Sequence, residues 1–202
     1  TQLTTAKQRF DDVINFRCPG RTLVSLGGIW PSTLERWRAE GMPAQVTTVG
    51  DLVELFHLHP HIWGAPQAEL FIYPQFPRSV VAETEETITY RNGYGIVCTD
   101  FKVDAYKSMP HFESFPVQNR QDWGKIRDRL QWHPDRVGET WRQQVDSYRL
   151  SDTPVILALG RAGSFYGALR DLVGMEGLSL MFYDEPDLIE AMMDTLLELD
   201  LK

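Results

Sequence analysis

The sequence has few cysteines and no long apolar segment, and each absence removes a class of protein. Cys18 and Cys98 are the two cysteines among 202 residues, which is too few for a disulfide scaffold, and they lack CxxC spacing. No stretch approaches the run of about 18 apolar residues that a membrane-spanning helix needs. The first residues hold no apolar signal core. These absences predict a cytoplasmic protein without a membrane span.

Positive charge is also scarce. Lys and Arg number 20 against 28 Asp and Glu, which gives a formal net charge of −8. This balance argues against nucleic acid and against an anionic membrane as partners. Hydrophobic residues make up 43% of the chain and charged residues 24%. That is ordinary globular composition, so we expect one sizeable folded core rather than disorder.

Strand-like and helix-like segments recur along the chain. The spacing of apolar residues predicts helices over 5–16, 32–37, 48–56, 119–132, 135–148, 165–173 and 184–199. We expect strands at 22–26 and 154–159, and the continuous apolar run of the second is typical of a parallel strand buried on both faces. Ser32 and Glu35 match a capping box at the start of their helix. The recurrence of strand, loop and helix predicts an α/β fold.

The segment near 84–103 departs from this alternation. Residues 87–90 alternate and include β-branched side chains, which is typical of a strand. Asn92 and Gly93 suit the positive φ angles of a tight hairpin turn, and 94–101 reads as the returning strand. We therefore expect a β-hairpin insertion over one end of the fold.

Three stretches of sequence, in this order, resemble the uroporphyrinogen decarboxylase superfamily. They are 21–28 with 33–43, 108–117 with 119–123, and 163–176 with 183–187. The resemblance spans nearly the whole chain and implies a (β/α)8 TIM barrel. Such a barrel usually takes about 250 residues, and this chain lacks an initiating Met and stops after a strongly periodic helix. We expect one uroporphyrinogen-decarboxylase-like domain over 1–202 that is the N-terminal part of the barrel, incomplete at the C-terminus.

The resemblance implies two chemistries that differ in their working residues. Decarboxylases of the superfamily carry a pair of arginines after the first strand, where this sequence has Gly28 and Ser32. Their central aspartate would fall near His59, and a tyrosine aligns with Arg170. These departures favour the branch that resembles cobalamin-dependent methyltransferases, whose partner is a corrinoid carrier protein. Its zinc ligands, a His and two Cys, belong to the C-terminal half, so the resemblance implies no metal or cofactor site within this chain.

The leading hypothesis is therefore an enzyme for corrinoid-linked methyl transfer with a small methylated substrate. A first alternative is decarboxylation of uroporphyrinogen acetate side chains in tetrapyrrole biosynthesis. A second is a non-catalytic fragment that acts as a binding or assembly module, because an open barrel edge and exposed apolar faces invite association. An assay of methyl transfer to free cob(I)alamin distinguishes the leading hypothesis from the two alternatives.

Candidate site residues come from the loops after the expected strands, where a TIM barrel builds its active site, and from the position of the decarboxylase aspartate that the resemblance implies. His59 lies nearest the position of the missing aspartate, and we expect it to be catalytic. Trp30 follows the first strand and either stacks on a planar ligand or packs under the next helix. Metal binding by His57, His59 and His61 is the less favoured reading, because Pro60 breaks any regular spacing.

A second group of candidates lies around the loop after residues 154–159. The loop has neither the Walker A nor the GxGxxG pattern, but it opens onto a helix N-terminus, which can hold an anion. We expect Tyr166 to be catalytic, and Arg161 and Ser164 to bind substrate. Arg170, on the helix itself, either binds substrate or pairs with Glu176 on the surface.

Overall fold

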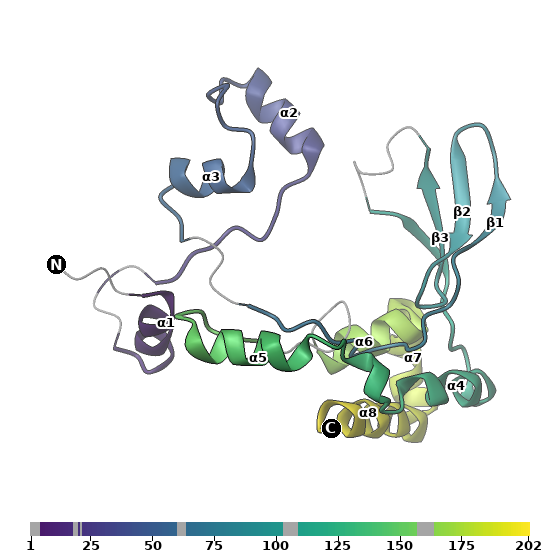
Figure 1. Cartoon of the computed structure of the whole chain (residues 1–202). Coiled ribbons are helices and arrows are strands. Elements are labelled where there is room, and N and C mark those ends of the chain that lie inside the picture. The colour runs from purple at the N-terminus through teal and green to yellow at the C-terminus, as the bar shows by residue number, and fades with distance from the viewer. Residues whose placement is uncertain (1–4, 18–19, 21, 60–63, 103–108, 157–163) are drawn as a thin grey trace. The chain divides into compact units, whose positions relative to one another are not determined.

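The structure is a computed structural model that describes residues 5–17, 20, 22–59, 64–102, 109–156 and 164–202 (Figure 1). Its helices and antiparallel sheet give a mixed α/β class, as the sequence predicts. The chain divides into two compact units. Unit 1 comprises Thr1–Pro66, Tyr106–Ser108 and Thr140–Ile156, and unit 2 comprises Gln67–Ala105, Met109–Glu139 and Leu157–Lys202.

Unit 1 contains four described helices. They are α1 (Ala6–Ile14), α2 (Pro31–Ala39), α3 (Val49–Leu55) and α5 (Trp141–Leu150). Capping boxes begin α1 at Thr5 and α3 at Thr48. The capping box predicted at Ser32 is wrong, because α2 starts earlier, at Pro31, with Trp30 as its N-cap. Proline fits the first turn of a helix because its φ is already helical and its missing N–H has no partner there.

The two predicted strands of unit 1 are present only as isolated parallel bridges. Ser25 pairs with His59, and Gly64 pairs with Val155. Val155 and Ile156 are 44% and 39% exposed. The described part of the 154–159 strand is therefore not buried on both faces, contrary to the prediction, and residues 157–159 lie outside the described residues.

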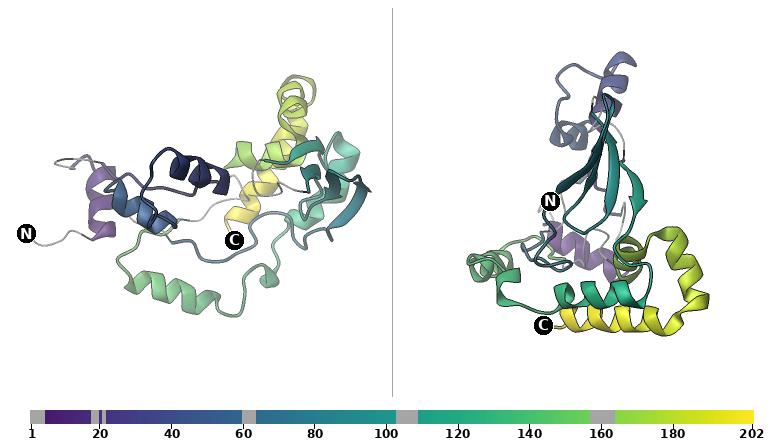
Figure 2. Two further views of the ribbon diagram at one scale, coloured as in Figure 1. Left: turned by 90° about the horizontal axis from the view of Figure 1, so that it is seen from above. Right: turned by 90° about the vertical axis from the view of Figure 1, so that its right-hand side faces the viewer.

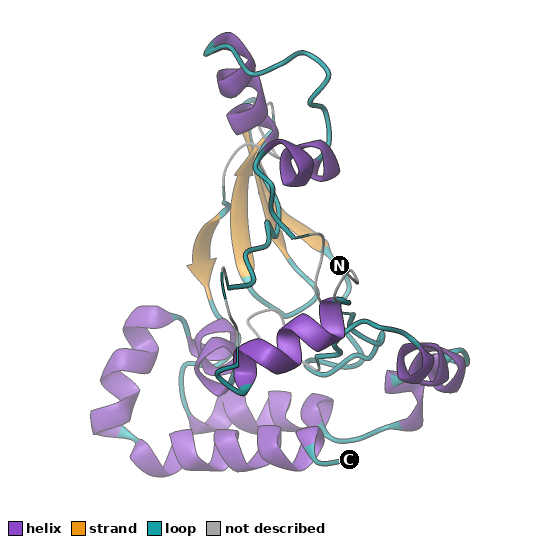
Figure 3. Ribbon diagram, turned by 90° about the vertical axis from the view of Figure 1, so that its left-hand side faces the viewer, coloured by secondary structure: helices purple, strands orange, loops and turns teal. Residues whose placement is uncertain are grey.

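Unit 2 holds a four-stranded antiparallel sheet in the order β1-β2-β3-β4 (Figure 3). Its strands are β1 (Ser79–Glu83), β2 (Thr87–Arg91), β3 (Val97–Phe101) and β4 (His111–Ser114). The predicted hairpin is confirmed as the β2-β3 pair within a larger sheet. Hydroxyl oxygens of Thr89 and Thr99 lie 2.7 Å apart across this pair. Such cross-strand contacts hold the register.

The turn between β2 and β3 differs from the predicted two-residue turn. It spans 92–96, and the Asn92 side chain accepts hydrogen bonds from the amides of Tyr94 (2.9 Å) and Ile96 (3.1 Å). The glycine with positive φ is Gly95, at +84°, rather than Gly93. An asparagine that hydrogen-bonds the following backbone builds its own turn, and this explains the longer connection.

The helices of unit 2 that follow the sheet pack together (Figure 2). Their apolar core also includes Phe71 and Ile72, which precede the sheet. The helices are α4 (Arg120–Ile126), the 3-10 helices η1 (Arg127–Leu130) and η2 (Pro134–Arg136), α6 (Phe165–Val173), α7 (Met175–Asp184) and α8 (Pro186–Asp200). The α8 helix contacts η1, α6 and α7. Leu130, Leu172, Leu178, Leu188 and Met192 are completely buried in this core.

Two predicted helices have different boundaries in the structure. The 119–132 helix is α4 followed by η1, and the 135–148 helix is η2 followed, after a break, by α5. The α7 helix has no counterpart in the prediction. The 165–173 and 184–199 predictions are confirmed by α6 and α8, within two residues at each end.

Arg136 is a fully buried arginine, only 1% exposed, that joins three segments of unit 2. Its guanidinium donates to the carbonyl oxygens of Gln131 (2.8 Å), Phe71 (2.7 Å), Glu69 (2.5 Å) and Arg129 (2.5 Å). Burial lowers the pKa of this guanidinium below its usual value, and the charge of Glu69 opposes that shift. The side chain thus fixes the segment before the sheet against η1 and η2.

A TIM barrel is not visible among the described residues, whose single sheet is antiparallel and whose parallel pairing is limited to two bridges. The barrel stays a prediction. None of the helices that the structure describes combines the length and the apolar character needed to cross a bilayer.

Candidate functional site

The candidate site of unit 2 lies on and beside α6. Ser164 is the N-cap of this helix, and its hydroxyl oxygen accepts a hydrogen bond from the Gly167 amide at 3.0 Å. Serine suits this position because its side chain satisfies one of the N–H groups that the first helical turn leaves unpaired. Ser164 therefore orients the first turn of α6 and the side chains that follow it.

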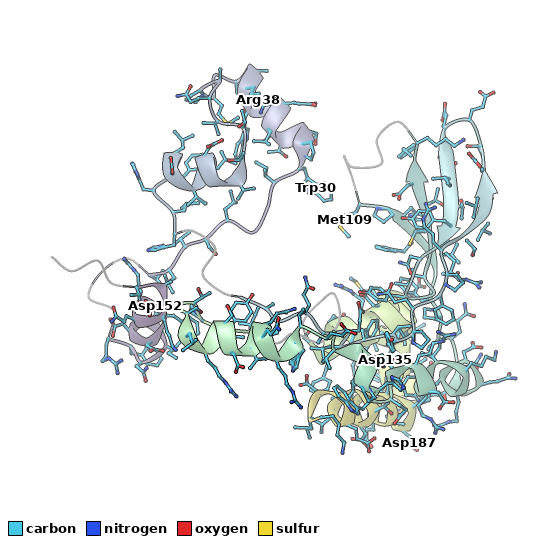
Figure 4. All side chains as sticks on the ribbon, viewed as in Figure 1. Trp30, Arg38, Met109, Asp135, Asp152 and Asp187 are labelled. Carbon is cyan, nitrogen blue, oxygen red and sulfur yellow. The ribbon has the colours of Figure 1, made fainter. Side chains whose placement is uncertain are left out.

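A cavity of about 210 Å³ opens against the C-terminal part of α6. Its lining residues are Met109, Phe112, Phe115, Arg170, Asp171 and Met175. Met109 lies just before β4 (Figure 4). The rings of Phe112 and Phe115 have centroids 6.1 Å apart. Thioether and aromatic side chains thus form most of the wall, and two charged side chains complete it.

Arg170 and Asp171 supply the charge in this cavity. The Arg170 Nη2 atom lies 3.5 Å from the Asp171 Oδ1 atom, and the side chains are 37% and 5% exposed. In the structure Arg170 pairs with Asp171. A surface ion pair with Glu176 was one of the two alternatives that the sequence left open for Arg170. A guanidinium next to a buried carboxylate keeps its orientation while its remaining N–H groups stay available for an anionic ligand.

Tyr166 lies four residues before Arg170 on α6 and is 51% exposed. Residues spaced by four occupy neighbouring positions on one helix face. The phenol and the guanidinium are thus placed one turn apart, and both remain accessible. This helix face can offer a hydroxyl and a cation to one small polar molecule.

His59, a candidate residue of unit 1, is held by its bridge to Ser25. The His59 Nδ1 atom lies 3.2 Å from both the amide nitrogen and the carbonyl oxygen of Val24. When Nδ1 carries no proton it accepts a hydrogen bond from the Val24 amide, and when Nδ1 is protonated it donates one to the Val24 carbonyl oxygen. Val24 thus fixes the ring through Nδ1, and Nε2 is the nitrogen left for a ligand or a proton.

Trp30 stands at the start of α2 and is 49% exposed (Figure 4). Half of the indole surface is therefore accessible for stacking, and the helix does not cover it completely. Trp30 and His59 belong to unit 1, whereas Ser164, Tyr166 and Arg170 belong to unit 2. Arg161 lies outside the described residues.

Asp171 and the aromatic wall of the cavity were missed by the sequence reasoning. One signal was available, because Asp171 interrupts the apolar run Leu169, Leu172 and Val173 on the buried face of α6. A carboxylate in such a position needs a partner, and Arg170 is adjacent. Phe112 and Phe115 carry no comparable signal, since only the fold brings β4 to α6.

The described residues contain no group of three or more His, Cys, Asp or Glu side chains that could hold a metal ion. These residues therefore provide no zinc site. Comparisons with protein-family models, with curated proteins and with solved structures found no match to this chain. The resemblance to the uroporphyrinogen decarboxylase superfamily remains a prediction from the sequence.

Proposed function

We propose that the chain is the N-terminal part of an enzyme of the uroporphyrinogen decarboxylase superfamily that transfers a methyl group between a small substrate and a corrinoid carrier. The α6 cavity is the observation that supports this most. It measures about 210 Å³, and among the residues that the structure describes Arg170 is the cation in its lining. A small, largely apolar molecule with one anionic group fits that lining.

A tetrapyrrole with several acetate side chains fits the same lining less well. Such a substrate needs several cations and a larger volume, because each buried carboxylate requires a charged or hydrogen-bonding partner. Gly28 and Ser32 also stand where the family's decarboxylases would have two arginines. These features favour methyl transfer over decarboxylation.

The barrel that the resemblance implies is part of this proposal. Each isolated bridge of unit 1 is parallel, and the first includes Ser25 in the expected first strand. Parallel pairing is the pattern that strands of a TIM barrel require. In this arrangement Ser25 and His59 would belong to one pair of neighbouring strands, and Gly64 and Val155 to another.

Within this proposal, the chain's own residues bind and orient the substrate. Arg170 holds an anionic group, with Asp171 fixing the guanidinium. Tyr166 donates a hydrogen bond to the polar end of the substrate, and the methionine and phenylalanine side chains exclude water from its methyl group. The corrinoid supplies the cobalt that accepts or donates the methyl group when it is bound.

The test is methyl transfer from a panel of small methylated donors to free cob(I)alamin, with the protein of the complete reading frame. We expect transfer with at least one donor, and a loss of about tenfold or more in kcat/KM for Arg170→Met, since a charge-assisted hydrogen bond contributes about 1.5–3 kcal/mol. Arg120→Met, on the exposed start of α4, is the matched control.

Tyr166→Phe and Tyr183→Phe form a second matched pair, because Tyr183 is 88% exposed on α7. The first substitution should lower kcat/KM and the second should not. Turnover of uroporphyrinogen without methyl transfer would replace the proposal with decarboxylation. No activity in either assay, with ligand-free protein, would favour a binding module instead.

A further inference from the structure

A second cavity in unit 2, separate in lining from the α6 cavity except for Phe115, lies between the sheet and α4. Its volume is about 570 Å³. Residues of β2, β3 and β4 form one side, and residues of α4 and η1 form the other. We refer to it as the sheet groove.

Within the described part of the chain, three cationic side chains and one carboxylate line the sheet groove. Arg91 ends β2, Lys125 lies on α4, and Arg129 lies on η1. Asp122 is the carboxylate, and it lies 2.9 Å from the Lys125 Nζ atom. The formal charge of the lining is therefore +2, in a chain whose net charge is −8. A local reversal of sign concentrates anions at this place and disfavours cations.

Arg129 is held in place before any ligand binds. Its Nη1 donates to the Pro74 carbonyl oxygen, and its guanidinium carbon lies 4.1 Å from the centre of the Phe76 ring. A guanidinium fixed on an aromatic face loses little conformational entropy when it binds an anion. Arg91, by contrast, is exposed at the rim.

Part of the groove wall is apolar. Phe76, Phe115 and Ile126 line it, and Ile126 is only 4% exposed. Gly95 keeps the wall open, because a Cβ atom there would lie 3.2 Å from the Phe76 ring and 3.3 Å from the Pro116 Cβ atom. The groove therefore combines a hydrophobic surface of ring size with fixed positive charge.

We propose that the sheet groove binds an organic anion with an aromatic or other apolar body and a carboxylate or phosphate head group. The body packs on Phe76, Phe115 and Ile126. The head group contacts Arg91 and Arg129, while the Asp122–Lys125 pair remains at the α4 side. This site is independent of the methyl-transfer proposal, which would stand unchanged if the groove bound nothing.

Three naphthalene compounds test the assignment because they share one ring and differ in head group. They are 1-naphthoate, 1-naphthyl phosphate and the uncharged 1-naphthylmethanol. Binding to the full chain is measured by calorimetry, and amide chemical shifts in NMR spectra locate it. We expect saturable binding of one or both anions, with shifts at Gly95 and Lys125, and at least about tenfold weaker binding of the alcohol.

Arg91→Met is the informative variant, since Arg91 is exposed and its loss leaves the core intact. This substitution should lower the affinity for the bound anion by about tenfold. Arg127→Met is the matched control, because Arg127 is an exposed arginine on η1 that does not line the groove. Its anion affinity should stay within about twofold of the unsubstituted chain.

Tighter binding of 1-naphthoate would indicate a carboxylate ligand, and tighter binding of 1-naphthyl phosphate would indicate a phosphate ligand. Either result supports the proposal. Equal affinity for the alcohol and the anions would overturn it, as would an unchanged anion affinity in Arg91→Met. Anion binding that shifts amides elsewhere and leaves Gly95 unaffected would also overturn it.

Discussion

Replacing Arg136 by methionine should be among the most destabilising single changes in unit 2. Methionine is an unbranched side chain that keeps most of the apolar stem of arginine, so the substitution mainly removes four hydrogen bonds to backbone oxygens. Phe71 is only 3% exposed, so its carbonyl oxygen would stay buried after it loses the hydrogen bond from Arg136. A buried carbonyl without a donor carries the full cost of its lost hydration.

The magnitude follows from the hydrogen bonds. A hydrogen bond to a charged group contributes about 1.5–3 kcal/mol net, but bonds from one side chain are not additive. The removal of the buried charge returns part of the desolvation cost. We therefore expect Arg136→Met to lower the free energy of unfolding by about 3–5 kcal/mol, a large share of the roughly 5–15 kcal/mol of a typical domain.

Urea denaturation of the full chain measures the change, and hydrogen exchange of the amides in 69–73 and 127–136 assigns it to unit 2. Arg136→Lys keeps the charge but loses the forked donor geometry, so it should also destabilise the chain. Arg127→Met is the surface control and should stay within about 0.5 kcal/mol. An Arg136→Met protein as stable as this control would refute the reasoning.

Two further predictions concern Gly174 and Tyr90. Gly174→Ala should cost about 2 kcal/mol or more, because φ is +84° there and the new Cβ would lie 2.5 Å from the Phe115 ring. Gly124→Ala, with nothing within 4 Å, should be neutral or stabilising in the same thermal unfolding assay. Burial and then the hydrogen bond to Asp100 raise the pKa of Tyr90 to about 12, so phenolate absorbance should show a late-titrating tyrosine that Tyr90→Phe removes. The neutral phenol is favoured in the folded state, and its stabilising contribution should therefore hold below about pH 10 and fall as the pH rises toward 12. A Tyr90 titration near pH 10, or equal effects of the two alanine substitutions, would contradict these predictions.

Local sequence signals predicted the elements whose type and limits are marked by residues within the element itself. The α6 and α8 helices have strong apolar periodicity, and Ser164 and Pro186 mark their starts. The β2-β3 pair follows from its β-branched residues and the turn at Asn92. These features depend on neighbours within a few residues, which the sequence shows directly.

Features that depend on distant contacts were not predictable. Arg136 falls in the predicted helix over 135–148, where no neighbouring residue marks it as buried, yet its guanidinium donates to carbonyls 65 and 67 positions earlier. Asp171 and the walls of the α6 cavity likewise require β4 to lie against α6. The break between η2 and α5 places one expected helix in two different units. Periodicity alone carries no information on such separations.

The carbonyls bound by Arg136 have a consequence for how the chain tolerates change in length. They come from residues on both sides of the sheet, at Phe71 before it and Arg129 after it. One side chain therefore holds together the two segments between which the sheet lies in the sequence, and the flexible parts of that region are the turns at the tips of the sheet. Lengthening a flexible closed loop costs only about 0.6 kcal/mol for each doubling. Arg136 thus allows the tips of the sheet, such as the β1-β2 turn, to gain or lose residues while the helical core remains in register.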